Sequence, residues 1–123
     1  MHRNTFLCSP KLLDEYQQYR MDDRILFAGQ ITGVEGYIES AASGILAGIN
    51  LANKTLGKPL FCPPPYTMLG ALMHYISDQT IEKFQPMGCA MGLLPPLEES
   101  IRDKKLRYEA FSQRSLSFYE GNV

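Results

Sequence analysis

Apolar residues recur every three or four positions between residues 34 and 54, which is the spacing of one face of an α-helix. This apolar row consists of Val34, Ile38, Ala41, Ala42, Ile45, Ile49 and Ala52. The pattern predicts a helix over about 34–54 whose apolar row packs against a core. Gly57 and Pro59 follow the pattern and are typical of a helix end.

Small residues form a second row on the same predicted helix. Ser40, Gly44, Gly48 and Ala52 are spaced four residues apart. Because glycine inside a helix costs about 1 kcal/mol relative to alanine, two glycines on one ridge indicate that another backbone or a flat ligand comes very close. The simpler interpretation is that this ridge packs on a parallel β-sheet.

Short extended segments are predicted before this helix. The apolar run 25–28 lies between Arg24 and Gly29, and a run of this kind is typical of a buried strand. Residues 5–8 are a second short extended candidate, which ends at Ser9 and Pro10.

Two further helices are predicted in the second half of the chain. Thr67 is suited to cap a helix over about 68–77 that has one apolar face. Ser100 and Asp103 have the spacing of a capping box and would open a charged helix over about 101–119. With few short strands and about three helices, the predicted fold class is α/β, and residues 1–123 form a single segment.

Composition narrows the classes of function. Twelve basic against thirteen acidic residues leave a formal charge of −1, so contact with a nucleic acid would need a local basic patch. The most apolar stretch falls short of the roughly 20 residues that a membrane span needs, which excludes a transmembrane protein. Three cysteines without a CxxC or Cys/His cluster favour a reduced, cytosolic compartment, and each thiol is interpreted as a small buried hydrophobe.

The strand, turn and helix over residues 25–54 form the unit with the clearest chemistry. Unpaired backbone amides and the positive end of the dipole at a helix N-terminus attract electron-rich groups. Gly29, Gly33 and Gly36 would let a flat ring or a phosphate approach that end. Their spacing is not the GxGxxG of dinucleotide-binding folds, so a ligand site and an ordinary strand-to-helix turn both remain open.

The residues around this turn closely resemble a signature of the TrmFO family. These proteins are folate- and FAD-dependent tRNA (uracil-5-)-methyltransferases related to the GidA tRNA-modification proteins. The resemblance rests on FAGQITGVEGYIESAASG at 27–44, and on MHRNTF (1–6), SPKLL (9–13), LGAL (69–72) with YI (75–76), FQPM (84–87), GLLPP (92–96) and RYEA (107–110). The sequence departs from the family pattern at 65–66 and 87–91.

Family members are several times longer than this chain, which looks like their C-terminal quarter. The resemblance therefore implies part of a Rossmann-like FAD-binding fold, without the fingerprint that holds the FAD pyrophosphate and without the family's catalytic cysteines. We accordingly assign no catalytic residue and no metal ligand. A segment of this kind is not expected to turn over substrate alone.

The family's reaction, as the resemblance implies it, forms 5-methyluridine in the T arm of tRNA. A methylene group passes from methylenetetrahydrofolate through reduced FAD to carbon 5 of a uridine, and NAD(P)H supplies the reducing equivalents. The expected partners are tRNA and the remainder of the parent enzyme, with no membrane and a cytoplasmic location. Two alternatives stay open: a segment of a GidA-like wobble-uridine modification protein, and a non-catalytic truncated binding module.

Two groups of site residues follow from the resemblance and the residue chemistry. The hypothesis for the flavin places it against Gly29, Gln30, Ile31, Gly33, Val34, Glu35 and Gly36. The hypothesis for the substrates places the folate or uridine near His2, Arg3 and Asn4, and tRNA phosphates near Arg102, Lys104, Lys105, Arg107 and Arg114. Because neighbouring acidic residues nearly cancel this positive charge, a solvated helix face is the favoured interpretation of this basic group.

Overall fold

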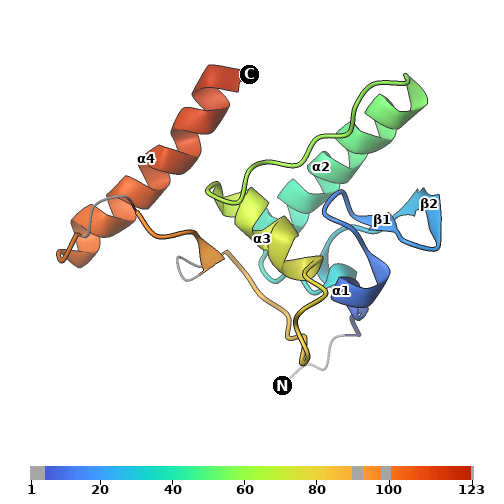
Figure 1. Cartoon of the computed structure of the whole chain (residues 1–123), viewed down its shortest axis with the longest axis horizontal. Coiled ribbons are helices and arrows are strands. Elements are labelled where there is room, and N and C mark those ends of the chain that lie inside the picture. Colours follow the sequence, from blue (N-terminus) through green and yellow to red (C-terminus); the bar gives the residue numbers. More distant parts are fainter. Residues whose placement is uncertain (1–4, 90–92, 98–100, 123) are drawn as a thin grey trace.

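The computed structural model describes residues 5–89, 93–97 and 101–122 (Figure 1). Along the chain it contains helix α1 (Ser9–Leu12), strands β1 (Gln18–Tyr19) and β2 (Asp22–Leu26), the 3-10 turn η1 (Gln30–Thr32), and helices α2 (Tyr37–Thr55), α3 (Met68–Ile76) and α4 (Lys104–Asn122). In Figure 1, α2 lies beside the β1–β2 hairpin, α3 packs against α2 and α1, and α4 lies to one side. The described residues thus combine helices with a two-stranded sheet, whereas a Rossmann-like fold stays a prediction.

The hairpin corrects the prediction of a buried strand at 25–28. Strand β2 ends at Leu26 and pairs antiparallel with β1, with Gln18 opposite Leu26 and Tyr19 opposite Asp22. Among the described residues this sheet has two strands, so its apolar run is not enclosed, and Ile25 is 42% exposed. Residues 5–8 are not in a strand, although the Leu7 amide donates to the Ile31 carbonyl at 2.7 Å.

Helix α3 lies at the centre of the packing. Its residues Leu72, Met73 and Ile76 are fully buried with Val34 and Leu46. On its other side, Ala71 packs with Leu94 and Phe111, which attaches α4 to the rest of the chain.

The cap of α3 is the one expected from the sequence. Thr67 Oγ1 accepts a hydrogen bond from the Gly70 amide at 3.0 Å and donates to the Pro64 carbonyl at 2.7 Å. The fully buried hydroxyl therefore satisfies one of the unpaired amides at the start of the helix and joins the helix to the proline-rich connector, residues 59–65.

Helix α2 begins at Tyr37, three residues later than expected. Gly33 and Gly36 have φ values of +89° and +101°, which are incompatible with an α-helix. Val34, between them, instead forms a bridge with Met87. The turn geometry therefore delays the helix.

The orientation of α2 contradicts the prediction for its apolar row. Ile38, Ile45 and Ile49 are 81%, 66% and 45% exposed, whereas the buried residues of the helix are Ser43, Leu46 and Asn50. Polar contacts hold that buried side in place. The Gln17 side chain donates to the Ser43 carbonyl at 2.9 Å, and Asn50 exchanges two hydrogen bonds with the Phe61 backbone.

Helix α4 begins later than the predicted 101 and uses a different cap. The Asp103 carboxylate accepts a hydrogen bond from the Leu106 amide at 3.0 Å, so Asp103 caps the helix. Ser100, the expected cap, lies outside the described residues. No helix among the described ranges is both long enough and apolar enough to span a membrane.

Candidate functional site

Three glycines shape the turn that leads into α2. Gly29, Gly33 and Gly36 all have positive φ values, which residues with a side chain rarely adopt. The Gly29 amide donates to Ser43 Oγ at 2.8 Å, and its carbonyl accepts from the Thr32 amide and hydroxyl at 3.0 and 2.7 Å. The first part of the turn is therefore held by its own hydrogen bonds and by α2.

The middle of the turn is covered by the segment 84–87. The Met87 amide donates to the Gly33 carbonyl at 2.8 Å, and the Glu35 amide donates to the Met87 carbonyl at 2.9 Å. A Cβ atom at Gly33 would lie 2.5 Å from Phe84 Cζ. Gly33 and Val34 are thus buried, and their backbone contacts with Met87 hold the turn. Reasoning from the sequence missed the part played by Phe84 and Met87, although the FQPM match at 84–87 was a signal for it.

The remaining predicted flavin residues form the accessible part of the turn. Gln30, Ile31, Glu35 and Gly36 are exposed, and Gly29 is half-buried. Next to them, the amides of Tyr37, Ile38 and Glu39 donate to no residue that the structure describes. These amides and the helix dipole make this end of α2 attractive to an electron-rich group.

Glu39 competes for the same end of the helix. Its carboxylate folds back against Gly36, and Oε2 lies 3.4 Å from the Cys89 amide nitrogen. A carboxylate is stabilised near a helix N-terminus by the dipole. A ligand that accepts hydrogen bonds from these amides would therefore displace or share space with this side chain. Reasoning from the sequence did not single out Glu39, although an acidic residue in the first turn of a helix is a recognised signal.

The cysteines are less buried than predicted. Cys8 and Cys89 are exposed and Cys62 is half-buried. Burial, together with the negative charges of Glu15 and Asp14, raises the pKa of Cys62 to about 12. Its Sγ lies 3.9 Å from His74 Nε2, but a thiol with so high a pKa is protonated at neutral pH and is a poor nucleophile. Among the described residues, no three His, Cys, Asp or Glu side chains are grouped as a metal site.

The predicted tRNA-binding residues lie around the start of α4, which Figure 1 shows at a distance from the hairpin. Arg102, Lys104 and Lys105 are exposed and Arg107 is half-exposed. Lys104 Nζ and Arg107 Cζ lie 5.5 and 5.7 Å from the centre of the Tyr108 ring. His2, Arg3 and Asn4 lie outside the described residues, so the structure does not place them.

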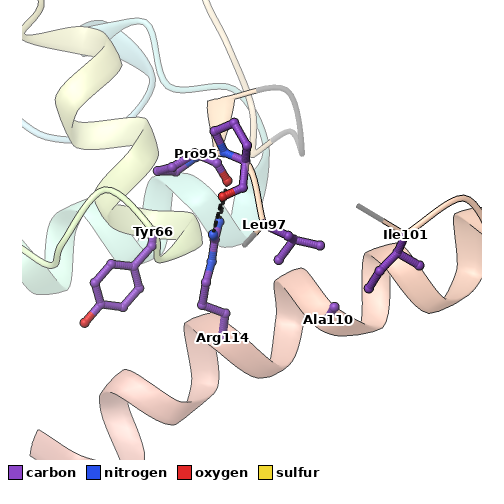
Figure 2. Close-up of a pocket in the computed structure, with 7 residues that line it drawn as sticks. Tyr66, Pro95, Leu97, Ile101, Ala110 and Arg114 are labelled. Carbon is purple, nitrogen blue, oxygen red and sulfur yellow. Dashed lines mark hydrogen bonds between the residues drawn. The ribbon is translucent and has the colours of Figure 1, made fainter. Parts of the chain in front are cut away.

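Arg114 differs from the other basic residues because its guanidinium is already bound. It donates to the carbonyls of Pro95 and Pro96 at 2.7 and 3.1 Å, as Figure 2 shows. The same side chain borders a largely apolar cavity of about 650 Å³ between α4 and residues 93–97. Its lining consists of Tyr66, Pro95, Pro96, Leu97, Ile101, Ala110 and Arg114. None of the other predicted site residues lines this cavity.

Comparison with known proteins gives two kinds of match. The family model described as glucose inhibited division protein A (GIDA) matches residues 1–59. The chain is also similar to proteins named methylenetetrahydrofolate–tRNA-(uracil-5-)-methyltransferase TrmFO. One from Staphylococcus haemolyticus is 56% identical over 98% of this chain, one from Staphylococcus aureus strain Newman is 54% identical over 98%, and one from Anoxybacillus flavithermus is 52% identical over 94%.

These matches confirm the resemblance found in the sequence. They also show that the chain spans only part of its relatives. The aligned residues make up 28% of the two staphylococcal proteins and 27% of the Anoxybacillus protein. The expectation that this part is the C-terminal quarter stays a prediction.

Proposed function

We propose, on the premise that this chain is a homologue of a segment of the TrmFO proteins, that it is a segment of a folate- and flavin-dependent tRNA (uracil-5-)-methyltransferase acting in the cytoplasm. The observation that carries the proposal is similarity above 50% identity along nearly the whole chain. The names of the relatives specify methylenetetrahydrofolate, tRNA and carbon 5 of uracil. The parent enzyme would form 5-methyluridine in the T arm.

The proposed role of this segment is to hold one side of FAD. When bound, the flavin would carry the methylene group and accept reducing equivalents from NAD(P)H. Gln30, Ile31, Glu35 and Gly36 would contact the ring, while Gly29, Gly33 and Val34 would hold the turn. The unpaired amides of residues 37–39 fit an electron-rich ring edge, provided that the Glu39 carboxylate turns away.

Flavin retention in the full-length Staphylococcus haemolyticus relative tests this assignment. Replacing the residues that match Gln30 and Ile31 by alanine should lower the FAD bound per protein, because both side chains are proposed to contact the ring. Both side chains are exposed, so the changes should leave the core intact. Alanine at the position matching Gln79, which is also exposed, is the control. A Gly33→Val equivalent should lose more flavin, since its side chain would collide with Phe84. Undiminished flavin in all the turn variants, with native circular dichroism, would remove the assignment.

The proposed contact with tRNA phosphates uses Arg102, Lys104, Lys105 and Arg107. The first three are exposed. Contacts between basic side chains and phosphates weaken as the salt concentration rises, so the proposed interaction should be salt-dependent. Reversing the charge at the positions matching Lys104 and Lys105 should weaken tRNA binding at low salt and flatten its salt dependence. Unchanged affinity would assign these residues to a solvated helix face. By resemblance alone, His2, Arg3 and Asn4 are proposed near the folate or uridine.

A GidA-like wobble-uridine modifier is the second candidate, because the GIDA family model matches residues 1–59. Nucleoside mass spectrometry on tRNA from a strain deprived of the full-length enzyme separates the two functions. Loss of 5-methyluridine supports the methyltransferase, and loss of a modified wobble uridine supports the alternative. A non-catalytic binding module would leave both nucleosides unchanged.

A further inference from the structure

The side of α2 that faces away from the core has an unusual composition for a solvent-exposed surface. We name as the outer face of α2 the exposed residues Tyr37, Ile38, Ala41, Gly44, Ile45, Gly48, Ile49, Leu51, Ala52, Thr55 and Leu56 at its C-cap. No member is charged. Both charged residues of the helix are engaged elsewhere, Glu39 at the N-terminal end and Lys54 with Gln18 and Asp23 of the hairpin.

The exposed apolar side chains on this face are large. Ile38 and Leu56 are 81% and 67% exposed, and Ile45 is 66% exposed. A surface helix of a complete domain normally places polar residues on this side. A contiguous apolar surface of this kind is a mark of an interaction site.

Glycines give an independent indication that something packs here. A Cβ atom added at Gly44 or Gly48 would meet no atom of the described residues within 4 Å, so nothing in this part of the chain requires glycine at either position. Both have ordinary helical backbone, where alanine would favour the helix. Gly48 also borders a shallow apolar groove of about 460 Å³, together with Leu51, Ala52, Thr55 and Leu56. Small residues in this position allow a second layer to approach the helix backbone closely.

We propose that the outer face of α2 is the interface with the part of the parent polypeptide that this chain lacks. The proposal depends on one part of the proposed function, namely that the chain is a segment of a longer enzyme. The expected occupant is the rest of the parent polypeptide, since nearly three quarters of the length of the relatives lies outside the match. A nucleic acid or an anionic membrane surface fits poorly, because the face carries no lysine or arginine to meet phosphate groups.

Accessibility of an introduced thiol tests the interface without flavin, folate or tRNA. Ala52→Cys in the 123-residue chain should react with a maleimide at a rate close to that of Ser112→Cys, which is exposed on α4. The same substitution at the matching position of the full-length Staphylococcus haemolyticus relative should react at least tenfold more slowly. Peptide mass spectrometry separates the new thiol from the native cysteines. Equal rates in the two proteins would overturn the proposal, as would protection that disappears on dilution, because that result indicates a second copy.

Alanine at the glycines provides a second test that does not depend on labelling. Gly48→Ala should raise the melting temperature of the 123-residue chain, because alanine favours the helix and its methyl group would meet no described neighbour. At the matching position of the full-length relative it should lower the melting temperature, because the added methyl group would separate the two layers. An increase in both proteins would contradict a close contact at this face.

Discussion

Asn50 makes the best-defined polar contact between α2 and the proline-rich connector. Its amide nitrogen donates to the Phe61 carbonyl at 2.7 Å, and its amide oxygen accepts from the Phe61 amide at 2.6 Å. The side chain is fully buried, whereas Phe61 is 37% exposed. Asn50→Ala removes two hydrogen bonds, each with a net contribution of about 1 kcal/mol, and leaves two backbone groups without their partner.

Water can reach part of the Phe61 backbone after the change, so we expect Asn50→Ala to lower the free energy of unfolding by about 2–3 kcal/mol. Urea unfolding followed by far-ultraviolet circular dichroism measures this loss. Asn53→Ala is the matched control: it lies on the same helix and its side chain bonds to no described residue, so a change within about 0.5 kcal/mol is expected. An Asn50→Ala loss no larger than that of Asn53→Ala would refute the reasoning.

Three further predictions concern α3 and the connector before it. Gly70→Ala should destabilise the chain by about 1–3 kcal/mol in the same assay despite the helix preference of alanine, because its Cβ would collide with the Pro64 carbonyl oxygen. Thr67→Ala should lower the free energy of unfolding by about 1–2 kcal/mol, because it removes the helix cap. Thr67→Ser keeps the hydroxyl and should retain most of this stability. Equal losses in the two variants would show that the hydroxyl is not responsible. Burial raises the pKa of Cys62 to about 12, so its thiol is protonated at a pH of about 8. At that pH a disulfide reagent should modify exposed Cys8 well before Cys62, which should react fully only after denaturation. Equally fast reaction of the two thiols would contradict the burial of Cys62.

Local signals in the sequence predicted several features of the fold. Thr67 before an apolar period led to a capped helix that the structure places at Met68–Ile76. Gly29, Gly33 and Gly36 indicated a turn, and all three have the positive φ that glycine tolerates. These features depend on a few neighbouring residues, which is why they could be recognised without tertiary information. The family resemblance rested on residues along most of the chain, and the similarity to TrmFO proteins confirmed it.

Which face of each element is covered could not be read from the same pattern. The apolar period of residues 34–52 indicates an amphipathic helix, but periodicity does not say whether the apolar side packs within this chain or on another layer. Here the inward side of α2 carries Ser43, Leu46 and Asn50, and the isoleucines are exposed. Gln17 and Phe61 bond to that inward side.

Capping residues and glycines were therefore enough to predict helix α3 with its cap and the glycine turn, and the motifs along the chain were enough to find the resemblance to the TrmFO proteins. Long-range packing, in contrast, sets the cover of Phe84 and Met87 over Gly33, the position of Glu39 against the start of α2, and the exposure of the hairpin strand that ends at Leu26. Capping and positive φ depend on neighbouring residues, whereas burial depends on which distant segments come to lie against an element.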